Sequence, residues 1–225
     1  MLISVRTRLI ANRTQLANAI RGYANEFGIS AAKGLAHIPM LLERIKAEKT
    51  VPELAQELFI SQAEEYAELE KKIADVEVKV KAWQRNDERS LRLNTIPGIG
   101  PIGSALLIMK TPAPELFQSG RQFAAWIGLT PKDHSTGGKL WHGGITRAGG
   151  GALRGVLVDG ATAVIHHARR SGKASRWLAD LLKRKPPKLA AVALANKMAR
   201  IAWKLMISGE TYSAKSGPAL TGCVT

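Results

Sequence analysis

The residues best suited to chemistry lie in a polar, glycine-rich stretch near the middle of the chain. It reads His134-Ser-Thr-Gly-Gly-Lys139, and Arg147 follows shortly after. The hydroxyl of Ser135 could attack a phosphorus atom while Lys139, Arg147 and backbone amides hold the phosphate. A serine in such a loop is more often a plain turn residue, so spacing alone leaves both interpretations open. His134 is a candidate general base or an ordinary surface histidine.

A second candidate site lies upstream, in the stretch Asn94-Thr-Ile-Pro-Gly-Ile-Gly-Pro101. Pro97, Gly98 and Gly100 end one helix, and Pro101 suits the first position of the next. We predict a helix-hairpin-helix in which Gly98 and Gly100 let the backbone approach a nucleic-acid phosphate. A tight turn between two core helices is the alternative.

The charge balance points to a polyanionic partner. The 225 residues include 33 Lys and Arg against 18 Asp and Glu, a formal net charge of +15. Residues 169–204 alone hold eleven of these cations and a single acid, Asp180. Within them, Lys183-Arg-Lys-Pro-Pro-Lys188 is expected to be a basic turn between two helices. The side chains expected to bind nucleic acid are Lys139, Arg147, Arg154, Lys183, Arg184, Lys185 and Lys188.

Several classes of site and location are not expected. Acidic residues after residue 93 are scattered, which argues against a two-metal centre within the chain. His166 and His167 are adjacent, so they point to different faces of a helix and do not form a metal pair. The single cysteine, Cys223, rules out an intrachain disulfide. We find neither a bilayer-spanning apolar run nor a signal peptide, and we expect a cytoplasmic protein with no membrane contact.

The spacing of apolar residues predicts an all-α fold. The expected helices cover residues 5–27, 52–93, two short helices within 94–110, 117–129, 152–170 and 189–208. These elements suggest a helical segment over 1–51, a coiled-coil arm over 52–93, a compact helical domain over 94–210 and a disordered tail over 211–225.

The expected arm carries a seam of apolar residues in steps of three and four. Its members are Tyr66, Leu69, Ile73, Val76, Val80 and Trp83. This repeat is typical of a coiled coil, so we expect the arm to pair with a second subunit and give a homo-oligomer. A long amphipathic helix packed on its own domain is the alternative.

The order of these motifs resembles one family of bacterial insertion-sequence transposases, the serine-containing recombinases that have a RuvC-like N-terminal domain and use a bridge RNA. The matching segments are Ile-Pro-Gly-Ile-Gly, Gly-Leu-Thr-Pro, His-Ser-Thr-Gly-Gly-Lys, Gly-Gly-Ile-Thr-Arg, Ala-Leu-Arg and Ala195-Asn-Lys-Met-Ala-Arg-Ile-Ala-Trp203. The resemblance covers roughly residues 5–212. It implies transposition of DNA, Ser135 as the nucleophile with Thr136 one residue away as the alternative, and a structured guide RNA as a second partner.

The sequence departs from this family at its N-terminus. Intact members carry three Asp and one Glu in the RuvC-like domain, where Mg²⁺ is expected, and we expect this chain to begin after that domain. We therefore expect no cofactor in this chain and no cleavage by the chain alone. Two functions stay open: the C-terminal half of a recombinase that supplies Ser135, and a non-enzymatic nucleic-acid-binding module. A structural helix-hairpin-helix protein is a third.

Overall fold

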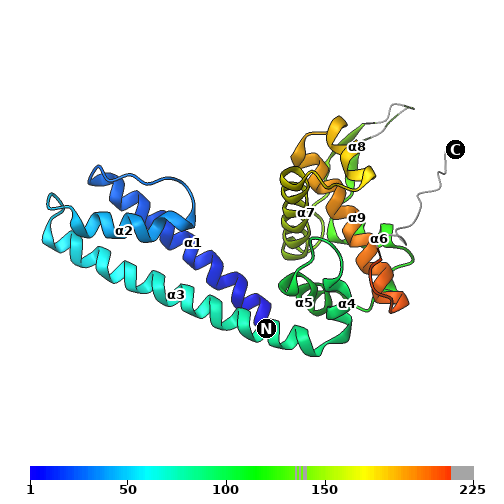
Figure 1. Cartoon of the computed structure of the whole chain (residues 1–225), viewed down its shortest axis with the longest axis horizontal. Helices are drawn as coiled ribbons and strands as arrows, with labels where there is room; N and C mark the ends of the chain where they lie inside the picture. The colour runs from blue at the N-terminus through cyan, green and yellow to red at the C-terminus, as the bar shows by residue number, and fades with distance from the viewer. Residues whose placement is uncertain (135, 137, 139–140, 214–225) are drawn as a thin grey trace. The chain divides into compact units, whose positions relative to one another are not determined.

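The computed structural model describes residues 1–134, 136, 138 and 141–213 of the 225-residue chain. They form two compact units, Met1–Val80 and Lys81–Thr225 (Figure 1). Both are helical over the described residues apart from one short strand pair, which confirms the predicted all-α class. Most of the tail predicted to be disordered, 211–225, lies outside the described residues.

The first unit is a long helical hairpin with a third helix packed on it (Figure 1). Helix α1 spans Leu2–Glu26, α2 spans Ile38–Ala47, and α3 spans Glu53–Asn86 and ends in the second unit. A single 3-10 turn at Leu35–His37 precedes α2. Pro39 stands in the first turn of α2, where a missing N–H costs nothing.

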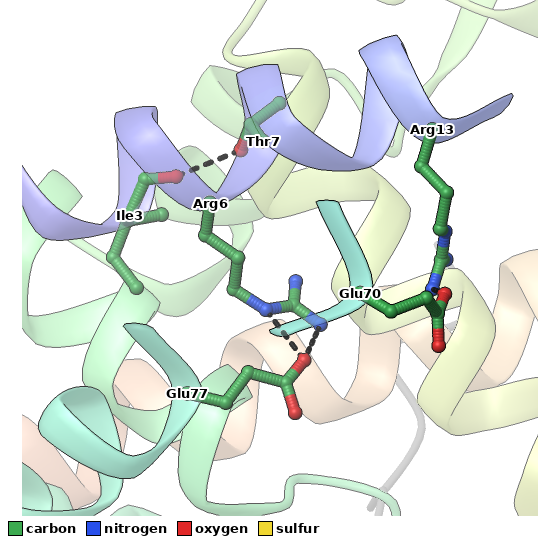
Figure 2. A network of polar contacts seen from close by, with 6 residues as sticks. All are labelled: Ile3, Arg6, Thr7, Arg13, Glu70 and Glu77. Carbon is green, nitrogen blue, oxygen red and sulfur yellow. Dashed lines mark hydrogen bonds and ion pairs between the residues drawn. The ribbon is translucent and has the colours of Figure 1, made fainter. Parts of the chain in front are cut away.

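Two ion pairs show that α1 and α3 run antiparallel (Figure 2). The Arg6 guanidinium donates to Glu77 Oε1 from Nε at 2.9 Å and from Nη2 at 2.5 Å. Further along, Arg13 Nη1 donates to Glu70 Oε1 at 2.5 Å. These two arginines of the basic N-terminal helix are therefore engaged in the packing of their own chain.

The part of the apolar seam between Tyr66 and Val80 packs inside the first unit. Leu69 and Ile73 form a cluster with Leu9 of α1, and Val76 packs at its edge. Tyr66 joins a larger cluster with residues of α1 and α2. The seam that we predicted to face a second subunit is therefore covered by α1, as in the alternative of packing on its own domain.

The helical pattern predicted to run unbroken over 52–93 is interrupted at Asp87. Helix α3 ends at Asn86, and α4 spans Glu88–Asn94. The Asp87 carboxylate accepts a hydrogen bond from the Ser90 amide at 2.8 Å, so it caps the new helix in place of continuing the old one. Short polar side chains compete in this way with the i to i−4 ladder of a helix.

The second unit is built around α7 (Gly151–Ser171) and α9 (Pro187–Ser208), which pack against each other (Figure 1). Each buries residues three and four apart, and many are alanines that allow close approach. The buried positions of α7 are Leu153, Leu157, Ala161, Ile165 and Ala168, and those of α9 include Ala191, Ala195, Met198, Ala202 and Leu205.

Shorter elements surround this pair. They are α4, α5 (Pro101–Lys110), a 3-10 turn at Pro114–Leu116, α6 (Gly120–Ile127) and α8 (Arg176–Arg184). Phe123 and Ile127 of α6 are fully buried, and Trp126 is partly buried beside Phe117. Strands β1 (Pro131–Asp133) and β2 (His142–Ile145) form an antiparallel pair where we expected only a loop. None of the described helices is long and apolar enough to cross a membrane.

Candidate nucleic-acid interface

The hairpin of β1 and β2 carries the segment in which we placed the nucleophile. Pro131 pairs with Ile145 and Asp133 pairs with His142. The hairpin is extended at both ends, because the His134 amide donates to the Trp141 carbonyl at 2.9 Å and the Thr146 amide donates to the Thr130 carbonyl at 2.9 Å. Ser135 and Lys139, which we predicted to act at this site, lie outside the described residues.

The hairpin leads into Arg147, which has an unusual backbone. Its φ is 56°, a positive value that no other non-glycine residue shows within the described part of the chain. Its amide donates to the Gly128 carbonyl at 3.2 Å. A Cβ on Gly128 would lie 2.7 Å from the Ala148 amide nitrogen, so the loop packs tightly on the end of α6. The left-handed conformation of Arg147 is therefore imposed by its surroundings.

A groove of about 1000 Å³ lies between this hairpin and the helices α8 and α9. Arg147, Lys185, Lys188 and Arg200 contribute its charged lining. The other lining residues are Leu129, Pro131, Gly143, Gly144, Ile145, Trp177, Leu181, Pro186, Leu189, Val192, Ala193 and Asn196. Not one of these residues is acidic, so the groove presents four cations from the β2–α7 loop, the α8–α9 turn and α9 without a carboxylate to neutralise them.

Two partly buried cations lie three residues apart on α9: Arg200, which lines the groove, and Lys197, which does not. Partial burial lowers the pKa of Lys197, and the nearby Arg200 lowers it further. The pKa of Arg200 is likewise lowered, first by burial and then by Arg121. Lys197 Nζ lies 4.3 Å from the centre of the Trp177 ring, a cation–π contact that partly offsets the desolvation of the ammonium. Arg200 Nε is buried and has no hydrogen-bond partner among the described residues.

Such a cluster of like charges favours the binding of an anion. Charges of one sign at close range raise the free energy of the fold through mutual repulsion, and an anion that binds among them relieves it. An arginine side chain stays protonated in proteins, so Arg200 can only lower this cost through a partner. Phosphate is the anion that guanidinium and ammonium groups bind most often in nucleic-acid complexes.

The remaining predicted contacts do not line this groove. Arg154 Nη1 donates to the Ile127 carbonyl at 3.1 Å and to the Gly149 carbonyl at 3.3 Å, so it ties α7 to the end of α6. Lys183 pairs with Asp180 at 3.5 Å, and Arg184 Nε donates to the Asp180 carbonyl at 3.3 Å. The structure thus brings Arg147, Lys185 and Lys188 together in the groove. Arg154, Lys183 and Arg184 instead contact groups of their own surroundings.

The two glycines of the proposed hairpin motif have different surroundings. Gly98 has a φ of +89°, and a Cβ there would lie 2.7 Å from the Gly160 carbonyl oxygen of α7. A side chain at Gly98 is therefore excluded by packing, whatever the turn binds. Gly100 has an ordinary φ of −85°, is exposed, and has open space where a Cβ would lie. It is the first residue before α5, where backbone amides are free of intrahelical partners.

Sequence reasoning missed the part of the site that α9 supplies. Lys197 and Arg200 stand three residues apart, a spacing that places them on one face of a helix. In the sequence they were counted only among the eleven cations of residues 169–204 and were not selected as site residues. Trp177 gave no sign that it would meet them. Asn196 was also overlooked; its side-chain amide donates to the Leu129 carbonyl at 3.3 Å and so holds the residue before the hairpin against α9.

No group of three or more metal-ligating side chains is found within the described ranges. His134 lies close to the hairpin backbone, since a Cβ on Gly143 would come within 3.1 Å of its imidazole ring. Thr136, the alternative nucleophile, is exposed.

Comparison with known proteins supports the general part of the resemblance seen in the motifs, the likeness to insertion-sequence transposases. Over 223 residues, 98% of this chain, it is 60% identical to a Sinorhizobium fredii protein, y4pF/y4sB, which is named as a transposase. It is 35% identical over 94% of its length to the transposase for insertion sequence element IS1111A of Coxiella burnetii. It is also 35% identical over 93% of its length to the transposase for insertion sequence element IS1328 of Yersinia enterocolitica.

The chain spans only 58%, 59% and 63% of the lengths of these three relatives, respectively. The family model described as Transposase IS116/IS110/IS902 matches residues 90–176, from α4 to the start of α8. This segment includes the glycine turn, the hairpin with Arg147, and α7. Through residues 90–176 the chain is therefore similar to the IS116/IS110/IS902 family of transposases.

Proposed function

We propose that this chain is the nucleic-acid-binding C-terminal part of an insertion-sequence transposase and that it holds DNA phosphates along the groove between the β1–β2 hairpin, α8 and α9. The observation that carries the proposal is the charge of that groove. Arg147, Lys185, Lys188 and Arg200 line it together, and its lining contains no acid. The net charge of +15 adds long-range attraction for DNA.

The four cations have different degrees of freedom, which suits them to different tasks. Lys185 and Lys188 are exposed and have long, flexible side chains, so their ammonium groups can reach a phosphate in several positions. Arg200 is partly buried, and its backbone packs on the start of α6, since a Cβ on Gly120 would lie 3.2 Å from the Arg200 Cα. The backbone of Arg147 is held in a left-handed conformation. In this proposal the two guanidinium groups bind phosphates with two nitrogens each and position the DNA, and the lysines add affinity.

The strand-exchange chemistry in this proposal rests on Ser135 and comes from the family resemblance. The serine oxygen forms a bond to a DNA phosphorus, one phosphorus–oxygen bond of the backbone breaks, and the departing oxygen takes up a proton as the serine loses its own. What supports this assignment is chain connectivity. Ser135 belongs to the segment that joins β1 to β2, and Pro131 and Gly143 of these strands line the groove.

The resemblance also adds partners to the proposal. A structured guide RNA would share the basic surface, and the acidic N-terminal domain of the resembled family would hold Mg²⁺. The competing function, a module that binds nucleic acid without catalysis, uses the same groove. A strand-transfer assay separates the two, because only the recombinase requires Ser135.

The proposal is tested by neutralising the groove one cation at a time. Arg200→Gln, Lys188→Gln and Arg147→Asn each remove a charge, and Asn tolerates the left-handed backbone at position 147. Each should lower DNA affinity about fivefold, the equivalent of about 1 kcal/mol for one charged contact. Lys173→Gln is the matched control, since Lys173 belongs to the same basic run and is exposed but does not line the groove. Equal affinities for all four variants and the wild type would refute the assignment.

A further inference from the structure

The walls of the groove are apolar, and this property is not needed for binding phosphates. Leu129, Ile145, Leu181, Leu189 and Val192 line it together with Trp177. Leu189 keeps 51% of its surface exposed although it is a large apolar residue next to Lys188. Exposed apolar surface inside a concave site indicates a ligand that has an apolar face of its own.

The groove also has room for such a ligand. Its volume of about 1000 Å³ is at the upper end of the range of sites that enclose small molecules. On the hairpin side, Gly143 and Gly144 form part of the wall, and Gly144 has nothing within 4 Å of the position that a Cβ would take. A flat ring can therefore approach the backbone closely at Gly144.

Trp177 is the residue best placed to recognise a flat ring. It lines the groove, and Lys197, which does not line it, lies over the ring at 4.3 Å. This cation–π contact holds the indole in a defined orientation. Tryptophan beside cations is the combination with which proteins bind unpaired nucleic acid, because bases stack on the ring while the cations hold the phosphates.

Duplex DNA does not match these features. Its base faces stack on each other, so a protein meets only base edges, sugars and phosphates. A duplex would use the four cations and leave the apolar walls without a partner. An unpaired nucleotide presents both a base face and a phosphate, and it uses both parts of the groove.

We propose that the groove receives an unpaired nucleotide, with its base stacked on Trp177 among the apolar side chains and the adjoining phosphates held by Lys188 and Arg200. This inference rests on the proposed function and makes it more specific: the groove binds nucleic acid where strands are opened. The same chemistry is offered by a displaced DNA strand and by an unpaired stretch of RNA.

The test uses the full chain and three probes of equal length: a single strand with all its bases, a single strand with abasic sites at its centre, and a duplex. DNA and RNA versions of the first probe distinguish the two sources. The intact single strand should bind roughly 5- to 150-fold more tightly than the abasic strand, the range expected for the loss of one stacked base. Abasic strands keep every phosphate, so this comparison does not depend on any change to the protein.

Variants then locate the stacking residue. Trp177→Ala should abolish the preference for the intact strand over the abasic strand, and Trp177→Phe, which keeps an aromatic ring, should restore that preference. Trp141→Ala is the matched control: Trp141 is 71% exposed on the hairpin and does not line the groove. Circular dichroism confirms that each variant is folded.

Failure of this inference is distinguishable from failure of the proposed function. Equal binding of intact and abasic strands overturns the inference, and so does a preference that survives in Trp177→Ala or disappears in Trp141→Ala. In those cases a loss of duplex affinity in Arg200→Gln still supports the groove as a phosphate site. If Arg147→Asn, Lys188→Gln and Arg200→Gln bind every probe as the wild type does, the proposed function itself fails.

Discussion

Replacing Gly160 by alanine is a stringent test of how the glycine turn packs on α7. A Cβ on Gly160 would lie 2.9 Å from the carbonyl carbon of Gly98 and would overlap its oxygen. In return, a Cβ on Gly98 would meet the Gly160 carbonyl oxygen at 2.7 Å and the Val164 side chain at 2.9 Å. Two backbones touch here, so neither partner can yield by a change of rotamer.

The expected magnitude follows from two opposing effects. Glycine to alanine within a helix normally stabilises by up to about 1 kcal/mol. Forced overpacking costs about 1–3 kcal/mol, occasionally more. The net effect of Gly160→Ala should be a loss of up to about 3 kcal/mol, which lowers the unfolding midpoint of a unit of this size by up to about 12 °C.

Gly155→Ala is the matched control on the same helix. It has no atom within 4 Å of the position that its Cβ would take. The variant should therefore gain up to about 1 kcal/mol from helix propensity alone. All five tryptophans belong to the unit Lys81–Thr225, so urea unfolding followed by tryptophan fluorescence reports on this unit. If Gly160→Ala is as stable as Gly155→Ala, the close contact of Gly98 with α7 does not exist.

Three further predictions concern the seam, the turn and the nucleophile. Ile73→Asp should unfold the first unit, because it buries a carboxylate against Leu9. A wild-type oligomer that this variant converts to folded monomers in sedimentation would contradict that. Gly100→Val should keep the helical content and weaken DNA binding, because we expect the amides at the start of α5 to hold a phosphate. Equal losses of helical content and DNA affinity would show that the motif is only a turn. The third experiment supplies the family's N-terminal domain, RNA and Mg²⁺. Ser135→Ala should then abolish strand transfer and the covalent protein–DNA adduct, and Thr136→Ala should not. A fully active Ser135→Ala variant would exclude Ser135 as the nucleophile.

Helices with strong periodicity could be predicted from the sequence. Helices were expected over 152–170 and 189–208, and the structure has α7 and α9 there, with Leu153, Leu157 and Ile165 buried on α7 and Met198 and Leu205 buried on α9. Periodicity identifies the buried face of a helix, but it does not identify the partner. This is why the seam at Leu69 and Ile73 was predicted to face another chain when it in fact packs on Leu9 of α1.

The hairpin could not be predicted because Ile145 is the one strong β-former in its two strands. Lys132, Asp133, Gly143 and Gly144 have low strand propensity, and the strand pair depends on tertiary context. Asn196 supplies part of that context through its bond to the Leu129 carbonyl. The capping function of Asp87, by contrast, was readable in principle, since Asp before a helical stretch is a common N-cap.

Only part of the candidate site could be predicted from the sequence. Arg147, Lys185 and Lys188 stood out because they lie in polar, glycine- or proline-rich segments. Arg200 and Lys197 lie within an apolar helix, where a cation is usually interpreted as a solvated residue of the outer face. Their significance depends on α8 and the hairpin lying next to α9, which only the fold shows.

The salt dependence of DNA binding tests the central claim most directly. Each phosphate neutralised by a protein cation adds about 0.9 to the slope of log affinity against log salt concentration for duplex DNA. A variant that combines Arg147→Asn, Lys188→Gln and Arg200→Gln should therefore lose roughly 3 units of slope relative to the wild type. Lys173→Gln should leave the slope unchanged, because Lys173 lies outside the groove. A triple variant with the wild-type slope would show that DNA does not lie in this groove.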